Sequence, residues 1–287
     1  MKLSIVTINY NNANHLNKTI SSVINQSTKA FEYIVIDGGS NDDSVSVIKE
    51  NAEHINYWVS EEDHGIYNAM NKGIKVAKGE YILFLNSGDW FYDNEVIKNV
   101  LPKLNHTDII YGNVISYYNE NKQSVNSGFG KIKPSLRHFF QGYSLPHPAT
   151  FHKKSLFEEY GYYDENLKIV SDWKFFIEAL VKHNATISYL DITISYFDMQ
   201  GISNANEKLI ANEHSIVLND LFGSKIYEDY KYLYSLKDKL KSKRIKKMEA
   251  ILSHKLGKKI FTNFLNISFF LFGNKKTKAD KQPTFLD

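Results

Sequence analysis

Short apolar segments alternate with helical patterns over the first hundred residues. Four apolar runs predict strands, at Leu3–Ile8, Tyr33–Ile36, Tyr57–Val59 and Tyr81–Leu85. Between them, apolar residues recur at helical spacing, as in the stripe from Ile66 to Ala77 that Gly79 ends. Alternating strands and helices of this length predict an α/β fold with a mostly parallel central sheet flanked by helices.

The pattern is more mixed in the middle of the chain and becomes helical at its end. Further strands are expected at Asp108–Tyr118, after the loop of Pro146–His152, at Thr186–Leu190 and at Thr193–Phe197, with a helix at Ser171–His183. Beyond Asn204 the pattern is helical and rich in Lys. We therefore expect an α/β domain at 1–204 and a C-terminal helical extension at 205–287, divided near Gly201–Asn206.

Composition and charge narrow the class of protein. The chain has 287 residues, 43% of them hydrophobic, which suffices for one large core or one domain with an appendage. It has no Cys, which excludes disulfides and fits a reducing compartment. No secretory signal pattern follows Met1, and no apolar run reaches the ~20 residues that span a bilayer. We expect a cytoplasmic protein without a nucleic-acid partner.

Polar and acidic residues follow each of the early strands. Asn9 follows the first, Asp37 the second, Asp63 the third, and Asn86 and Asp89 the fourth. The carboxyl ends of parallel strands share one edge of a sheet, where open α/β sheets bind ligands. Each acid alone could be a turn or helix-capping residue. Clustered carboxylates repel one another unless a cation is present, so together they favour a site for Mg²⁺ or Mn²⁺ with Asp89 as ligand.

Four motifs carry a resemblance to a known family. They are Val35–Ser44 (VIDGGSNDDS), Asp63–Gly73 (DHGIYNAMNKG), Gly79–Asp89 (GEYILFLNSGD) and Ser171–Trp173 (SDW). In this order and spacing they resemble family 2 glycosyltransferases of the GT-A (Rossmann-like) fold. The nearest resemblance is to bacterial enzymes that build capsule, exopolysaccharide or lipopolysaccharide, and it covers about residues 1–200.

The resemblance assigns expected roles to individual residues. It implies a nucleotide-sugar donor, with UDP favoured, and a divalent metal, Mn²⁺ or Mg²⁺, held by Asp89. Asp172 would be the catalytic base. The residues expected to bind the nucleotide-sugar are Thr7, Asn9, Asp37, Asp63, Gly65, Asn71, Lys72, Asn86, Ser87 and His147. The family often has two or three acids in the metal loop, whereas Asn86 and Gly88 take two of those places here.

Two of these residues also have structural interpretations. Asp172 begins an apolar-faced helix, where an acidic residue is stabilising in any protein. As a base, it would take the proton of an acceptor hydroxyl during attack. His147 lies between two prolines in LPHPATF, which fix its backbone near the diphosphate or acceptor, but it could instead be bonded within the loop.

The C-terminal extension is basic. Residues 225–287 hold 16 Lys and Arg against 6 Asp and Glu, while the remainder holds 19 against 26. The segment Ile251–Lys276 mixes Lys with Phe, Leu and Ile, which fits an interfacial helix with Lys258, Lys259, Lys275 and Lys276 facing anionic lipid. Alternatively, it packs on the catalytic domain or forms a homo-oligomer contact. The first interpretation predicts a peripheral protein at the inner face of the cytoplasmic membrane.

The favoured function is an inverting glycosyltransferase of bacterial surface polysaccharide synthesis, moving a hexosyl or N-acetylhexosaminyl group to a saccharide or lipid-linked saccharide. The alternative is a catalytically inactive GT-A-like module that binds nucleotide, as the small number of acids in the metal loop suggests. A third hypothesis is a glycoside hydrolase that uses Asp89 and Asp172 as its carboxylate pair. It gives no reason for the segments around Asp37 and Asp63, so it ranks last.

Overall fold

A nine-stranded sheet organises the first part of the chain, and its first half is parallel as predicted. The parallel strands are β1 (Leu3–Asn9), β2 (Glu32–Asp37), β3 (Tyr57–Ser60) and β4 (Tyr81–Phe84), in the order β3-β2-β1-β4. The structure is a computed structural model that describes residues 1–199 and 206–272. Strands β1, β2 and β4 are buried along their whole length, because helices cover both faces.

The second half of the sheet is mixed. Strand β8 (Thr150–Lys153) runs antiparallel to β4 and to β6 (Ile109–Asn119). Strand β9 (Ile187–Asp198) is parallel to β6. Strand β5 (Trp90–Phe91) is antiparallel to β9, and β7 (Lys122–Asn126) is antiparallel to β6. The two strands expected at 186–190 and 193–197 are one strand whose register against β6 shifts near Asn113. Strands β5 and β7 were not predicted, because β5 has two residues and β7 is exposed throughout.

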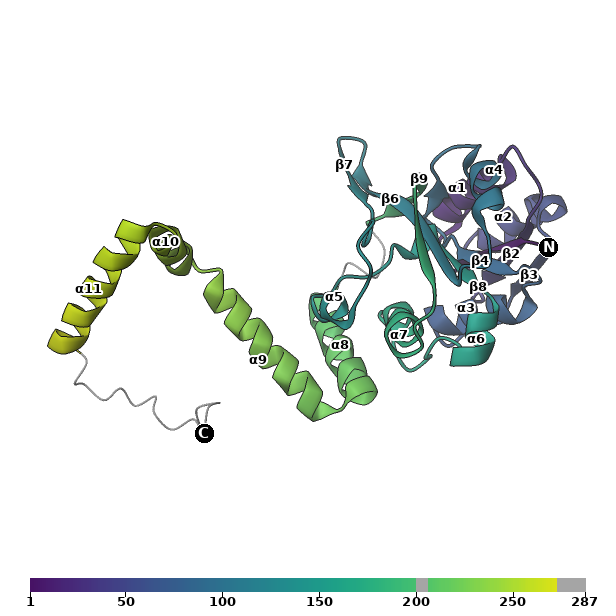
Figure 1. The fold of residues 1–287 in the computed structure, drawn as a ribbon. Coiled ribbons are helices and arrows are strands. Elements are labelled where there is room, and N and C mark those ends of the chain that lie inside the picture. The colour runs from purple at the N-terminus through teal and green to yellow at the C-terminus, as the bar shows by residue number, and fades with distance from the viewer. Residues whose placement is uncertain (200–205, 273–287) are drawn as a thin grey trace. The chain divides into compact units, whose positions relative to one another are not determined.

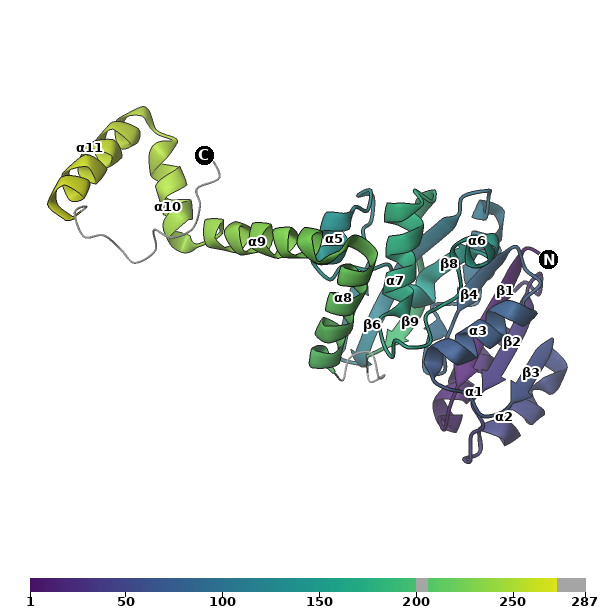
Figure 2. The same ribbon diagram turned by 90° about the horizontal axis from the view of Figure 1, so that it is seen from below.

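Helices pack on both faces of the sheet (Figures 1 and 2). Helices α1 (Ala13–Ile24), α2 (Ser44–Glu50) and α4 (Val96–Val100) share one core with the odd-numbered residues of β1. Helices α3 (Ile66–Val76), α6 (Ser155–Tyr160) and α7 (Ser171–Ile177) cover the opposite face. The helix expected at Ser171–His183 is α7 continued by a π-helical turn at Glu178–Lys182.

The remaining described segments are helical. They are α5 (Leu136–Phe140), α8 (Glu207–Phe222), α9 (Ser224–Leu240), α10 (Lys243–Leu252) and α11 (Lys255–Phe272), with short 3₁₀ turns at Ala52–His54, Leu101–Lys103 and His147–Ala149. The chain divides into two compact units after Leu218, so most of α8 belongs to the first unit. The predicted division near Gly201–Asn206 falls mainly outside the described residues. Over 1–199 and 206–272, no helix is long and apolar enough to cross a membrane.

Candidate active site

The ends of β1, β2 and β3 meet around the carboxylate of Asp37. Its oxygens accept hydrogen bonds from Asn9 Nδ2 (2.7 Å), from the Ser40 hydroxyl (2.6 Å) and backbone N–H (2.9 Å), and from the Ser60 hydroxyl (2.6 Å). Burial raises the pKa of the Asp37 carboxyl, but these donors outweigh it and hold the pKa below its ordinary value. Asp37 therefore stays ionised and ties three strand ends together.

Asp63 lies against the same strand ends. A Cβ built on Gly38 would lie 2.3 Å from Asp63 Oδ2, so only glycine leaves room for this carboxylate beside β2. Asp63 Oδ1 accepts the N–H of Gly65 at 2.9 Å, which closes the turn before α3. Lys72 Nζ pairs with Glu61 Oε1 at 2.8 Å and thus fixes the segment before this turn. The structure brings the Asp37 and Asp63 segments together as predicted.

Thr7 is more deeply placed than the other predicted residues. It is fully buried in β1, and its hydroxyl donates to the carbonyl of Leu85 at 2.8 Å. Its nearest other polar neighbour is the Tyr33 hydroxyl at 3.1 Å. These contacts join β1 to β2 and to the end of β4, so Thr7 stabilises the edge of the sheet, or rim, where the ends of β1, β2 and β3 meet.

The loop from Asn86 to Asp89 is pinned by α1. The hydroxyl of Thr19 donates to the Asp89 carbonyl (2.7 Å) and accepts the N–H of Gly88 (3.0 Å), while the N–H of Ser87 donates to the carbonyl of Ile8 (3.0 Å). Asn86 Oδ1 is buried and has no hydrogen-bond partner among the residues that the structure describes. A buried acceptor without a partner is what a bound ligand or ion would satisfy.

A second carboxylate, which the sequence prediction missed, lies beside this loop. The N–H of Asp198, the last residue of β9, donates to Asp89 Oδ1 at 3.1 Å, and a Cβ built on Gly88 would lie 3.7 Å from Asp198 Oδ2. Burial raises the pKa of the Asp89 carboxyl well above its usual range, and the charge of Asp198 adds to the rise. Asp198 follows a predicted strand, which is the same signal that singled out Asp37 and Asp89.

Lys18 of α1 is the cation near this pair. Its ammonium lies 3.0 Å from the centroid of the Trp90 ring, which also stacks on Tyr196 at 4.8 Å. Partial burial lowers the pKa of Lys18, and the charge of Asp198 offsets part of the lowering. In the part of the chain that the structure describes, no three His, Asp or Glu side chains gather into a metal-binding group. Any metal here would have two carboxylates, Asp89 and Asp198, rather than a full protein cage.

Asp172 stands in the first turn of α7 and is held by α3. The hydroxyl of Tyr67 donates to Asp172 Oδ1 at 2.9 Å and contacts the carbonyl of Ile169 at 2.5 Å. Burial raises the pKa of the Asp172 carboxyl, and the Tyr67 hydrogen bond opposes this rise. Burial and the Asp172 charge raise the pKa of Tyr67 well above its ordinary value, so its hydroxyl remains a donor. The site prediction did not name Tyr67, although the residue belongs to the motif Asp63–Gly73 and could have been identified from it.

Asn71, another residue of that motif, braces the loop that leads to α7. Its Nδ2 donates to the carbonyl of Tyr163 (2.9 Å) and to Glu165 Oε1 (2.8 Å), and its Oδ1 accepts the N–H of Tyr163 (3.0 Å). The side chain is buried and its polar atoms are used within the protein. The structure therefore places Asn71 on the side of Asp172.

His147 lies in an aromatic cluster with Phe84, Tyr163 and Phe176. Its ring stacks on Phe84 at 5.2 Å, and its Nε2 is 3.1 Å from the Tyr163 hydroxyl. Burial lowers the pKa of His147 to about 4. The ring is therefore neutral at physiological pH, and His152 lies 5.7 Å away in the same cluster. A phosphate role for His147 stays a prediction.

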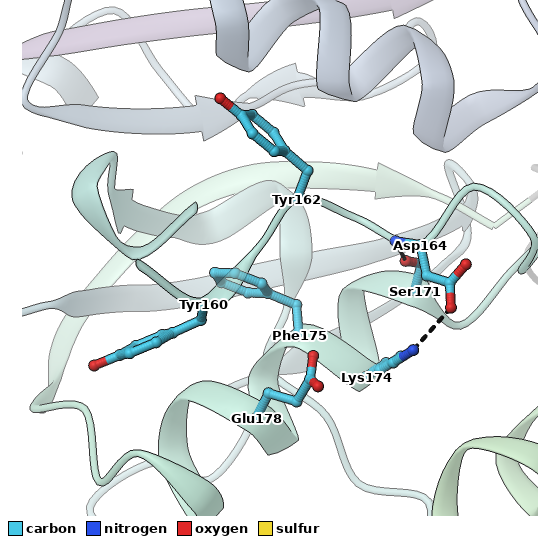
Figure 3. Close-up of a pocket in the computed structure, with 7 residues that line it drawn as sticks. All are labelled: Tyr160, Tyr162, Asp164, Ser171, Lys174, Phe175 and Glu178. Carbon is cyan, nitrogen blue, oxygen red and sulfur yellow. Dashed lines mark hydrogen bonds and ion pairs between the residues drawn. The ribbon is translucent and has the colours of Figure 1, made fainter. Parts of the chain in front are cut away.

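A polar cavity of about 300 Å³ opens against another face of α7 (Figure 3). It is lined by Tyr160, Tyr162, Asp164, Ser171, Lys174, Phe175 and Glu178. Lys174 Nζ pairs with Asp164 Oδ2 at 2.8 Å in its wall. No residue predicted for the site lines this cavity, so it is separate from the groups described above.

Comparisons with known proteins find relatives of this chain by sequence. Residues 4–160 match the model of Glycosyl transferase family 2. An uncharacterized glycosyltransferase of Mycobacterium tuberculosis is 33% identical over 208 residues, covering 71% of this chain and 78% of that protein. A PGL/p-HBAD biosynthesis glycosyltransferase of Mycobacterium bovis is 27% identical over 208 residues, covering 70% and 78%.

Two solved structures share the fold. S. aureus TarS 1–349 in complex with UDP-GlcNAc has a TM-score of 0.59 and 21% identity, covering 78% of this chain and 69% of that chain. The matched region covers only 41% of a longer TarS chain. The mannosyltransferase PcManGT from Pyrobaculum calidifontis, in complex with GDP-Man and Mn²⁺, has a TM-score of 0.57 and 12% identity, covering 96% and 88%. At these identities, the likeness concerns the fold alone.

Proposed function

Because the chain belongs to glycosyl transferase family 2, we propose that it is an inverting glycosyltransferase that moves a hexosyl or N-acetylhexosaminyl group from a UDP-sugar to a saccharide hydroxyl. We further propose that it acts in the synthesis of a bacterial surface glycan. The complex of TarS with UDP-GlcNAc supports the choice of nucleotide. One observation carries the proposal: the SDW motif and the D-x-G-I-Y motif meet in the 2.9 Å bond from Tyr67 to Asp172.

Asp172 is suited to act as a general base. Its half-buried carboxyl has a raised pKa, which increases its affinity for a proton, while the Tyr67 bond keeps the ionised form accessible. In the proposed step, the acceptor oxygen forms a bond to the anomeric carbon as its proton passes to Asp172. The bond from that carbon to the diphosphate oxygen breaks, and the nucleoside diphosphate leaves with the electron pair. Displacement from the opposite face inverts the anomeric carbon.

The donor would lie along the strand ends. Asn9 Oδ1 is buried and makes no hydrogen bond to any described residue, so it can accept one from a base or ribose. Asp37 and Asp63 frame the same rim. A divalent ion fits beside them, because Asp89 and Asp198 offer two carboxylates and Asn86 Oδ1 an orphaned amide oxygen. When bound, such an ion stabilises the negative charge of a leaving diphosphate.

Donor turnover tests the proposal. Purified protein is incubated with a panel of UDP-sugars and Mn²⁺, with and without saccharide acceptors, and release of UDP is measured. We expect UDP release by the unaltered protein and a loss of at least ~100-fold in Asp172→Asn. The control is Asp191→Asn, an exposed residue of β9. Saturable UDP binding without turnover on any sugar would instead favour the inactive nucleotide-binding module.

We also propose that α11 brings the enzyme to an anionic membrane bearing a lipid-linked acceptor. One face of α11 presents exposed apolar side chains, namely Leu256 (70% exposed), Ile260 (60%), Phe264 (62%), Ile267 (60%) and Leu271 (63%). Lys255, Lys258 and Lys259 lie near the start of α11, and α10 adds Lys243, Arg244, Lys246 and Lys247. An apolar face rimmed by Lys is typical of helices that lie in a membrane interface. Lys275 and Lys276, also predicted to contribute, lie outside the described residues.

Vesicle binding tests the role of α11. Lys258 and Lys259 are replaced together by Gln, which should weaken binding to phosphatidylglycerol vesicles ~30-fold, at about 1 kcal/mol for each cation. Phosphatidylcholine vesicles should show little difference between the proteins. A matched control replaces Lys49 and Lys103, two exposed cations of the first unit, together by Gln. Equal binding of the double variant and the unaltered protein to anionic vesicles would contradict the proposal.

A further inference from the structure

Helix α8 inserts a buried carboxylate beneath the loop that precedes the proposed base. Glu213 is only 5% exposed, and its oxygens accept three consecutive backbone N–H groups, from Lys168 (2.8 Å), Ile169 (3.0 Å) and Val170 (3.2 Å). Consecutive N–H groups that converge in this way form a concave anion-binding nest. The carboxylate therefore fixes the backbone conformation of residues 168–170.

Asp172 follows this nest by two residues, so its placement depends on it. The Tyr67 hydroxyl reaches the carbonyl of Ile169 and Asp172 Oδ1 from α3, while Glu213 reaches the N–H of Ile169 from α8. Residue 169 is thus held on both of its backbone polar groups, by helices more than a hundred residues apart in the sequence. Figures 1 and 2 show α8 beside α7. Held between two helices, the loop can present Asp172 in one orientation.

The residue after Glu213 holds the other side of Asp172. The ring of His214 stacks on Trp173 with centroids 4.0 Å apart, and the indole N–H of Trp173 donates to the carbonyl of Tyr143 at 3.2 Å. Successive residues of α8 thereby contact the chain immediately before and immediately after Asp172.

We propose that Glu213 is a positioning residue for the base, acting through the 168–170 nest, an inference that rests on the role proposed for Asp172. Geometry at a base matters steeply, because a displacement of about 1 Å can cost ~100-fold in rate. The residues on which the donor would lie stand at the ends of β1 and β2, in the turn after β3 and in the Asn86–Asp89 loop, and the hydrogen bonds that Glu213 makes to the described residues go to the 168–170 segment instead. Loss of Glu213 should therefore lower kcat and leave the KM for the UDP-sugar unchanged.

The test compares Glu213→Gln and Glu213→Ala in the full chain, with UDP-GlcNAc as the first donor probe. Gln keeps one acceptor oxygen but places an NH₂ donor against N–H groups, so kcat should fall ~10-fold, and ~100-fold in Ala. The control is Glu207→Gln, an exposed acid in the first turn of the same helix. Rates are normalised to the fraction of protein that binds UDP, so a partly unfolded variant still gives a usable value.

Two readouts separate positioning from simple stabilisation. The acid limb of the pH–kcat profile should move in the Glu213 variants, because the environment of Asp172 changes, and hydrogen exchange should accelerate at residues 168–173. Glu213→Gln with an unchanged kcat and pH profile, while Asp172→Asn is inactive, would overturn this inference and leave the proposed function standing. An active Asp172→Asn would instead overturn the function on which it rests.

Discussion

The stability of the chain should depend on the charge of one buried imidazole, His152 of β8. The ring is fully buried, stacks on Phe176 of α7 at 5.4 Å and lies near Phe157 and Phe84. Neither ring nitrogen has a hydrogen-bond partner of normal geometry within the described residues. Burial, together with the charge of the neighbouring His147, lowers the pKa of His152 to about 3. The folded protein therefore keeps this imidazole neutral.

The sign and size of the effect follow from linkage. The ordinary pKa of 6.5 applies to His152 in the unfolded chain, against about 3 in the folded chain. Between these values the unfolded state binds more protons, so the free energy of unfolding falls as the pH is lowered through this window. At 1.36 kcal/mol per pH unit below 6.5, His152 alone removes about 2 kcal/mol of stability on going from about pH 7.5 to about pH 5.

Replacement of His152 by Phe tests this value. Phenylalanine keeps an aromatic ring beside Phe176 and removes both nitrogens. Urea unfolding gives the free energy of unfolding at about pH 7.5 and about pH 5. The decrease between these two pH values should be smaller in His152→Phe than in the unaltered protein, by about 2 kcal/mol. Other titrating groups are common to both proteins and cancel. His15→Asn, at an exposed position of α1, is the control. An equal pH-dependent loss in His152→Phe and unaltered protein would refute the buried neutral imidazole.

Three further predictions concern the site. Tyr67→Phe removes a bond that lowers the pKa of Asp172, so the acid limb of the pH–kcat profile should move to higher pH. Asn71→Ala leaves backbone groups of the loop before α7 unpaired and should cost about 1–3 kcal/mol in urea unfolding. In the presence of UDP, Asp198→Asn should weaken Mn²⁺ binding measured by electron paramagnetic resonance at least ~10-fold, whereas Asp191→Asn should not. Equal Mn²⁺ affinity in both variants would remove Asp198 from the metal site.

The parallel half of the sheet was predictable because its strands are short apolar runs separated by helices with clear periodicity. The four predicted strands all form, and β1, β2 and β4 are buried along their whole length, as expected of parallel strands between layers of helices. The antiparallel half was harder to predict. Strand β9 mixes half-buried residues through a register shift, so its pattern reads as two strands. Strand β5 is too short to carry any period.

The position of the polar residues around Asp37 was predictable for the same reason, since these residues follow strand ends that the pattern marks. The contacts that complete the site depend instead on tertiary approach. Asp198 reaches Asp89 across 109 positions of sequence, and Glu213 reaches residue 168 across 45. An acid at the end of a strand is visible in the sequence. Which partner it meets depends on the order of strands in the sheet. Asp198, at the end of β9, meets Asp89 because β9 pairs with β5, which begins directly after Asp89.

The part of the chain that matches the family model and the part that follows it have different proposed roles. The match to the family model ends at residue 160, whereas Asp172, Asp198 and Glu213 all follow it. The matched part contains the strand ends on which the donor would lie. The part beyond it carries the proposed base and Glu213 of α8, which holds the loop before the base, whereas Tyr67 of α3 lies within the matched part. Because the base must meet the acceptor hydroxyl, residues near α7 and α8 are where differences in acceptor choice should reside. Exchanging residues 161–218 between this chain and a relative should therefore change the acceptor preference and leave the donor preference in place.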